Sequence, residues 1–170
     1  MVEYLKKKGF GHYSSSGILK EILAQRGLPA TRFNMSALAD KLLRAYEGGV
    51  LHLSHESAQK EGVKDYVLEA IHRVDEATYI RSIGGVVLGV DADVEKRFER
   101  ATKRKEGEKD NVTYEQFLAD VKREDEGGGG TGSNIRAALK VADAIVTNNG
   151  TQEELFAQVE NALGQAQGKR

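Results

Sequence analysis

The sequence predicts an α/β protein with a doubly wound parallel sheet and helices on both faces. Short apolar segments typical of buried strands alternate with segments of helical periodicity along the chain. The clearest example is the β-branched run at residues 86–90 (VVLGV), which passes through Asp91 and Asp93 into a helical segment. The length of 170 residues is enough for a hydrophobic core, and we expect a single domain over residues 1–170.

The N-terminal half is predicted to hold two strands with helices between them. The strands are residues 10–15 (FGHYSS) and 66–71 (YVLEAI). Glycines that follow periodic apolar segments mark helix ends at Gly9, Gly27 and Gly62. The helices expected here are residues 2–8, 17–26, 36–46 and 51–61, and Ser36 is the expected N-cap of the third; residues 75–82 are expected to form a short helix or a turn.

The C-terminal half is predicted to continue the alternation. Strand 86–90 leads into a helix at 94–105, and a second strand at 144–147 precedes the turn Asn148-Asn149-Gly150. Thr113, with Gln116 three residues later, is typical of a capping box that opens a helix. The other elements expected here are helices at 113–126, 135–141 and 153–163 and a flexible loop at 127–133 (GGGGTGS).

The composition excludes several classes of protein. The 26 acidic and 25 basic residues nearly cancel, so non-specific binding to nucleic acid is not expected. The chain contains no cysteine, which excludes disulfides and thiolate metal sites. No apolar segment approaches membrane-spanning length, and no signal-peptide core follows the lysines at 6–8. We expect a cytoplasmic protein that binds neither nucleic acid nor membrane, with its oligomeric state open.

Three arginines give the strongest indication of function. Arg97, Arg100 and Arg104 are spaced by three and four residues, so they share one face of the predicted helix at 94–105. This helix follows a buried strand, and ligands of α/β sheets bind where strands end. Guanidinium groups suit phosphate oxygens, so the pattern favours a phosphate or nucleotide site. A solvated charged surface is the competing interpretation.

Other polar residues near strand ends give weaker indications. His12, followed by Tyr13, is read either as a buried or crevice histidine or as a catalytic base. Arg32 and Arg73 are loop cations that together could line a second anion site at the same edge of the sheet.

Three further patterns have plain structural readings. Asp91 and Asp93 could position metal or water, or Asp93 could cap the following helix. His52 and His55 are only three residues apart and belong to no HExxH motif, so surface histidines are favoured over a metal site. The glycine run has P-loop spacing but Ser133 and Asn134 stand where the P-loop needs lysine and serine or threonine. No protein metal site is predicted from these residues.

Taken in order, these segments resemble the P-loop nucleotide kinase superfamily, in particular dephospho-CoA kinase and kinase-like relatives. The resemblance runs over nearly the whole chain and depends on the order of its segments rather than on one motif. The segments that carry it are GFGHYS (9–14), RGLP (26–29), strand 66–71 with Arg73, VDADVEKRFERATKR (90–104), NVTYEQF (111–117), Ala142-Asp143 and TNNGT (147–151).

The resemblance implies a lid, two cofactors and two ligand sites. ATP and Mg²⁺ would be the cofactors, and a small phosphorylated or nucleotide-like molecule would be the acceptor. Residues from about 94 to 126 would form the lid, in which the Glu-Arg-x-x-x-Arg pattern places Arg100 and Arg104 on the donor phosphates. Arg97, Asn148, Asn149 and Gly150 would lie at the donor nucleotide, and His12, Tyr13, Arg32 and Arg73 toward the acceptor.

Two departures from the family pattern shape the expectation. The motif GxxxxGK[ST] does not occur in the chain, and Ser15, Ser16 and Gly17 stand where relatives often carry a charged residue. We therefore expect an N-terminally shortened kinase that misses the first, central strand, with weak or no phosphotransferase activity. The alternatives are a non-catalytic nucleotide- or CoA-binding module and an unrelated doubly wound ligand-binding domain.

Overall fold

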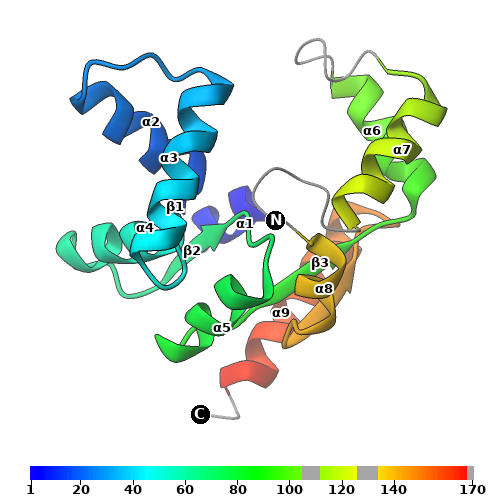
Figure 1. Ribbon diagram of the computed structural model, residues 1–170. Helices are drawn as coiled ribbons and strands as arrows, with labels where there is room; N and C mark the ends of the chain where they lie inside the picture. The colour runs from blue at the N-terminus through cyan, green and yellow to red at the C-terminus, as the bar shows by residue number, and fades with distance from the viewer. Residues whose placement is uncertain (105–111, 126–133, 168–170) are drawn as a thin grey trace. The chain divides into compact units, whose positions relative to one another are not determined.

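The structure, a computed structural model, describes residues 1–104, 112–125 and 134–167. It divides into two compact units, Met1–Gly85 and Val86–Arg170, whose elements are labelled in Figure 1. Each unit combines short parallel strands with helices, so the predicted α/β class is confirmed. The doubly wound arrangement and the single domain over residues 1–170 stay predictions.

The first unit pairs two parallel strands, β1 (Gly11–Ser14) and β2 (Tyr66–Glu69). Gly11 lies opposite Tyr66 and Ser14 opposite Glu69, so both strands end at one edge. The strands fall within the predicted segments, and β2 ends two residues earlier than expected. The helices of this unit are α1 (Val2–Lys7), α2 (Ser15–Gln25), α3 (Arg32–Ala45), α4 (Val50–Lys60) and α5 (Val74–Ser82).

Side-chain caps fix where two of these helices begin. Ser14 Oγ accepts a hydrogen bond from the Gly17 N–H at 3.0 Å, which closes the N-terminus of α2 directly after β1. Thr31 Oγ1 accepts from the Asn34 N–H at 3.1 Å and caps α3. The expected N-cap at Ser36 is therefore wrong, because the helix already begins at Arg32.

The core of the first unit lies between α2, α3 and α4. Leu19 and Leu23 of α2 pack against Leu38 and Leu42 of α3, and Leu53 of α4 lies against this cluster. Leu23 is 2% exposed, so truncating it to alanine would cost about 2–5 kcal/mol of folding free energy. This cluster therefore packs α2 and α3 together and against α4. Helix α2 begins directly at the end of β1.

The second unit pairs β3 (Leu88–Asp91) with β4 (Ala144–Thr147), also in parallel. Asp143 closes the start of this pair, since its carboxylate accepts the Val87 N–H at 2.7 Å and its own N–H donates to the Val87 carbonyl at 2.8 Å. The helices of the unit are α6 (Val94–Arg104), α7 (Tyr114–Asp125), α8 (Ile135–Lys140) and α9 (Gln152–Gln167).

Helices α6 and α7 pack through aromatic rings. Phe98 of α6 lies 5.1 Å from Tyr114 and 5.5 Å from Phe117 of α7, measured between ring centroids. The capping box predicted at Thr113 and Gln116 is present, with reciprocal hydrogen bonds of 2.9 and 3.2 Å. The two helices thus form one packed pair within the predicted lid. Residues 105–111 of that lid and the predicted flexible loop at 127–133 lie outside the described residues.

Helix α9 packs on the strand pair and completes the edge of β4. Val159 of α9 is fully buried, and Val146 of β4 is 2% exposed. The Gln158 amide accepts the Thr147 N–H at 2.9 Å and donates to the Thr147 carbonyl at 3.0 Å, as a neighbouring strand would. Within the ranges 1–104, 112–125 and 134–167, no helix has the length and apolarity needed to cross a bilayer.

Candidate functional site

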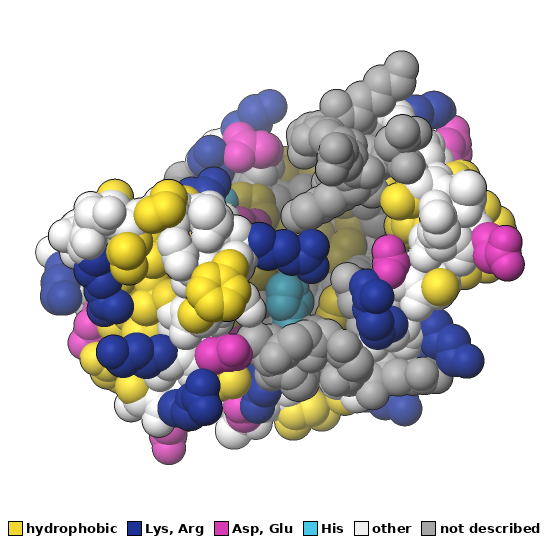
Figure 2. All heavy atoms as spheres, turned by 45° about the horizontal axis from the view of Figure 1, so that its top comes forward, with side chains coloured by type: hydrophobic (Ala, Val, Ile, Leu, Met, Phe, Trp, Pro, Cys, Tyr) yellow, Lys and Arg dark blue, Asp and Glu magenta, His cyan; other side chains and the backbone are white. Residues whose placement is uncertain are grey.

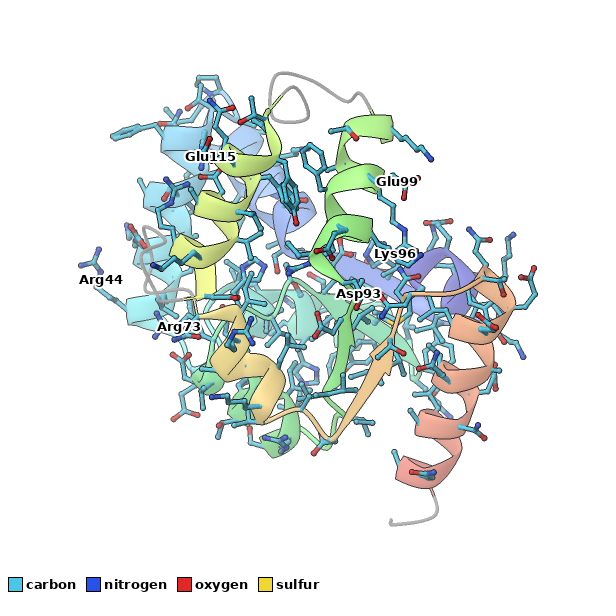
Figure 3. The ribbon with its side chains drawn as sticks, turned by 90° about the vertical axis from the view of Figure 1, so that its right-hand side faces the viewer. Arg44, Arg73, Asp93, Lys96, Glu99 and Glu115 are labelled. Atoms are coloured by element: carbon cyan, nitrogen blue, oxygen red, sulfur yellow. The ribbon has the colours of Figure 1, made fainter. Side chains whose placement is uncertain are left out.

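The carboxyl edge of β3 and β4 gathers most of the predicted donor-side residues. The strands are parallel, so the segments that follow them lie at the same edge. Asp91 ends β3, Asn148 follows β4, and the Asn148 N–H donates to the Asp91 carbonyl at 2.7 Å. Figure 3 shows Asp93 where β3 passes into α6, with Lys96 and Glu99 farther along that helix.

Asp93 and Asn149 join α6 to the turn after β4 through two reciprocal hydrogen bonds. The Asp93 N–H donates to Asn149 Oδ1 at 2.8 Å, and Asn149 Nδ2 donates to Asp93 Oδ1 at 2.9 Å. The Asp93 carbonyl accepts the Arg97 N–H at 3.0 Å, which places Asp93 at the start of α6. Asp93 therefore occupies the predicted position at the start of α6, and its carboxylate also binds the turn that follows β4.

Arg100 reaches the same turn from the second turn of α6. Its Nη1 donates to the Asn148 carbonyl at 2.6 Å, so a guanidinium lies beside the Asn-Asn-Gly segment. Arg97 is half-buried, and its Nε is shielded from solvent without a hydrogen-bond partner among the described residues. The structure describes the backbone of Arg104 as the last residue of α6, whereas its side chain lies outside the description.

Gly150 allows a carboxylate to sit close to the backbone of the turn. A Cβ at this position would overlap the Glu154 carboxylate. That carboxylate accepts the Thr151 N–H at 2.9 Å, and Thr151 Oγ1 accepts the Glu154 N–H at 3.2 Å. This capping box opens α9 and fixes the far side of the turn. Asn148, Asn149 and Gly150 therefore form one hydrogen-bonded corner with Asp93 and Arg100.

Arg136 is a cation at this edge that the sequence reasoning missed. Its guanidinium donates to Asp125 Oδ2 at 2.8 Å, joining α8 to α7. The hydrogen bond and charge of Asp125, with a smaller contribution from Asp91, raise the pKa of Arg136. The Arg136 guanidinium therefore lies within electrostatic range of Asp91 at the end of β3. No sequence spacing linked Arg136 to the three arginines of α6.

A second polar group lies at the carboxyl edge of β1 and β2. His12 Nε2 is 3.2 Å from Glu69 Oε1, a pair that is ionic only when the imidazole is protonated, and Nε2 is shielded from solvent and makes no hydrogen bond to the residues that the structure describes. Ser15 Oγ donates to the Glu69 carbonyl at 3.1 Å. Glu69 is 39% exposed at its side chain, so it presents a carboxylate at this edge. The sequence reasoning missed Glu69 because it extended the strand past it to residue 71.

Tyr13 does not share a face of the strand with His12, because successive residues of a strand point to opposite sides. Tyr13 Oη donates to Glu61 Oε2 at 2.7 Å, and this hydrogen bond raises the pKa of Tyr13 to about 12. Its ring also packs edge-on to Tyr66, with centroids 6.0 Å apart. Tyr13 therefore belongs to the side of the pair that α4 covers.

The two predicted acceptor arginines occupy different settings. Arg73 stands at the start of α5 and donates to Asp75 through Nε at 2.8 Å and Nη2 at 2.9 Å. This pairing lowers the pKa of Asp75. Arg32 is exposed as the first residue of α3. Of the four predicted acceptor residues, His12 and Tyr13 lie on β1 and Arg73 follows β2, whereas Arg32 lies on α3.

The loop between β2 and α5 is unusual in its backbone. Ala70 has a φ of 69°, and it is the one non-glycine residue with positive φ in the part of the chain that the structure describes. Glu76 Oε2 accepts the His72 N–H at 2.8 Å and holds the loop, while burial raises the pKa of Glu76. This strained and braced loop leads from Glu69 at the end of β2 to Arg73, four residues later in the chain.

The charged side chains are otherwise dispersed. On the face shown in Figure 2, Lys and Arg side chains lie among acidic and apolar ones rather than in one continuous basic patch. Within the described ranges, no three His, Cys, Asp or Glu side chains are grouped to hold a metal ion. Local hydrogen-bonded arrangements, rather than a strong overall field, distinguish the two edges.

Comparison with protein-family models gives no match. The chain is similar to a UPF0200 protein of Thermococcus kodakarensis, with 26% identity over 96% of this chain and 88% of the relative. It is also similar to a UPF0200 protein of Methanocaldococcus jannaschii, with 27% identity over 95% of this chain and 80% of the relative. Similarity to archaeal UPF0200 proteins therefore extends over nearly the whole chain.

Proposed function

We propose that this chain is a cytoplasmic nucleotide-binding protein of the kinase lineage, with its donor nucleotide at the carboxyl edge of β3 and β4. The hydrogen bond from Arg100 to the Asn148 carbonyl carries the proposal, since it brings together two segments that are 48 residues apart. The resemblance to dephospho-CoA kinase assigns one segment to the phosphates of ATP and the other to its adenine. A doubly wound sheet in which the two strand pairs belong together is part of the same proposal.

The chemistry of this edge suits a polyanion with a planar base. Arg97 and Arg100 supply guanidinium donors, which bind phosphate oxygens strongly. The corner of Asn148, Asn149 and Gly150 offers backbone polar groups held in place from both sides. In the proposed reaction, Arg100 and Arg104 would stabilise the charge that develops on the transferring phosphoryl group.

Mg²⁺ enters this proposal only together with ATP. Magnesium is usually held by one or two carboxylates and by the phosphates of the substrate, rather than by a complete protein cage. Asp91 could supply a carboxylate at this edge, whereas the Asp93 carboxylate is engaged with Asn149. Bound Mg²⁺ would neutralise phosphate charge during transfer.

The acceptor is proposed to lie at the β1–β2 edge. Arg73 and the exposed Arg32 would attract a phosphorylated or nucleotide-like acceptor, and Glu69 with His12 would receive the proton of its hydroxyl group. Tyr13 is retained only as a residue that shapes this region, because it faces Glu61. The chain lacks GxxxxGK[ST], so the proposed turnover is weak or absent.

Calorimetry with ATP and ADP, with and without Mg²⁺, tests the donor site. Arg100→Ala should weaken binding by roughly tenfold or more, because a hydrogen bond to a charged group contributes about 1.5–3 kcal/mol. Lys103→Ala is the matched control, since it removes a cation of the same helix that pairs with Glu99. Equal affinity of wild type and Arg100→Ala, or no binding of any purine nucleotide, would contradict the proposal.

The second candidate is a binding module without catalysis, favoured by the absence of the phosphate-cradling motif. It predicts nucleotide or CoA binding with no transfer of phosphate. A sensitive phosphotransfer assay with dephospho-CoA and nucleoside monophosphates separates the two candidates. Magnesium-dependent transfer that Arg100→Ala abolishes would support the enzyme, and binding without transfer would support the module.

A further inference from the structure

Asn149-Gly150 is the one Asn-Gly sequence in the chain. The backbone nitrogen that follows an asparagine can attack the side-chain amide carbon, and glycine hinders this approach least because it has no Cβ. Gly150 is exposed, and its N–H donates no hydrogen bond to any of the residues that the structure describes. A nucleophile and its target carbon are therefore adjacent in an accessible turn.

The side-chain amide of Asn149 is restrained by hydrogen bonds to both of its polar atoms. Asn149 Oδ1 accepts the Asp93 N–H at 2.8 Å, and Asn149 Nδ2 donates to the Asp93 carboxylate at 2.9 Å. Both polar atoms of the side chain are thus directed to the start of α6. Ring closure needs the amide carbon to approach the Gly150 nitrogen, and the two hydrogen bonds to Asp93 oppose any rotation of the amide during this approach.

We propose that Asn149 is a latent deamidation site whose rate is set by its contact with Asp93. When the contact opens, the Gly150 nitrogen loses its proton to solvent and forms a bond to the Asn149 side-chain carbon. The nitrogen Nδ2 takes up a proton from solvent, its bond to that carbon breaks, and it leaves as ammonia. Water then adds to one of the two carbonyl carbons of the resulting cyclic imide and opens the ring to aspartate or isoaspartate, without oxidation or reduction.

Aspartate or isoaspartate at position 149 cannot form both hydrogen bonds that Asn149 makes with Asp93. Deamidation removes the Nδ2 donor and places a new carboxylate opposite the Asp93 carboxylate, so an attraction becomes a like-charge repulsion. Helix α6 would then lose the hydrogen bond from Asn149 Nδ2 to the Asp93 carboxylate, and it would be held to the turn by the Asp93 N–H, which a carboxylate oxygen can still accept, and by the bond from Arg100 to the Asn148 carbonyl. Deamidation would therefore irreversibly weaken the contact between α6 and the turn after β4. This proposal does not depend on whether the protein binds nucleotides.

Peptide mass spectrometry measures this directly. The full chain is incubated at mildly alkaline pH and cleaved with trypsin, and the fragment at 141–169 is followed for the mass change from amide to acid. This fragment also contains Asn148 and Asn161, which serve as internal references. Isoaspartate is confirmed with an isoaspartyl methyltransferase.

Asp93→Ala should accelerate deamidation at Asn149 by roughly tenfold, the change expected from losing a hydrogen bond to a charged group, while Asn148 and Asn161 stay unchanged. Glu99→Ala is the matched control, because it removes an acid from α6 that pairs with Lys103. An Asp93→Ala rate equal to wild type would overturn the proposal.

A comparison within the wild-type protein removes any dependence on how well the variant folds. The rate at Asn149 in urea gives the value for the unrestrained sequence, and the folded protein should react at least several-fold more slowly. If folded and unfolded wild type deamidate at Asn149 equally fast, Asp93 does not restrain the site and the proposal fails.

Discussion

Replacing Ala70 by glycine should stabilise the first unit, although glycine usually weakens a fold. Ala70 has a φ of 69°, a left-handed conformation that costs an L-residue about 1–2 kcal/mol. Glycine pays no such steric cost, but its freer unfolded chain lowers stability by about 0.4–1 kcal/mol. Taking the middle of each range, the relief of strain exceeds the entropic loss, and the free energy of unfolding should rise by about 0.8 kcal/mol.

Urea denaturation followed by circular dichroism measures this gain. Ala30→Gly is the matched control, since Ala30 is an exposed loop residue without positive φ and should lose about 0.4–1 kcal/mol. The two substitutions are chemically identical, so opposite signs isolate the backbone strain. A lower denaturation midpoint for Ala70→Gly, parallel to the control, would refute the reasoning. Because strain collects at functional loops, the same variant should also change ligand affinity at the β1–β2 edge if that edge binds the acceptor.

Four further predictions concern single contacts. Glu61→Gln removes the acceptor charge beside Tyr13, so spectrophotometric titration should show that the tyrosine with a pKa of about 12 falls toward the ordinary value, whereas Glu56→Gln should leave it unchanged. Arg73 lowers the pKa of Asp75, so this pair stabilises the fold above the unfolded pKa of aspartate, about 3.9, and the contribution is lost as the pH falls further. Burial raises the pKa of Glu76, so its ionisation costs stability as the pH rises through about 4.3, and Glu76→Gln should gain stability over wild type above that pH in urea titrations. Asp143→Ala leaves the Val87 N–H without its carboxylate partner in a buried place and should cost about 1–3 kcal/mol in the same assay; an unchanged midpoint would mean that solvent replaces the bond.

Periodicity and caps made most of the elements predictable, and the misses have local causes. Helix α2 follows β1 without a loop because Ser14 ends the strand and caps the helix at once. Helix α3 was expected only from Ser36, whereas it begins at Arg32, and Phe33 in its first turn is 80% exposed and lies outside its buried face. The hydroxyl group of Thr31 caps that helix, and the search for apolar periodicity overlooked this threonine as an N-cap.

The site was predictable only where the function of a residue depends on its own segment. The arginine spacing on α6 and the Asn-Asn-Gly turn were each visible in the sequence. The pairing of Asp93 with Asn149 was not, because it joins residues 56 positions apart and depends on the register of β3 and β4. Glu69 was missed because the predicted strand was extended past it to residue 71, and its closeness to His12 depends in addition on the pairing of β1 with β2.

The bond from Arg100 to the Asn148 carbonyl gives a physical reason why this arginine can serve both the fold and a ligand. In the structure its guanidinium is matched with a neutral acceptor, and a phosphate oxygen is a charged one. Charge-assisted hydrogen bonds are roughly twice as strong as neutral ones, so exchange of the carbonyl for a phosphate is favourable. The Asp93–Asn149 pair would keep the start of α6 attached during that exchange, so Arg100 could turn to the ligand without the helix leaving the turn. Loss of that pair should therefore weaken phosphate binding through Arg100 even though neither Asp93 nor Asn149 carries a positive charge.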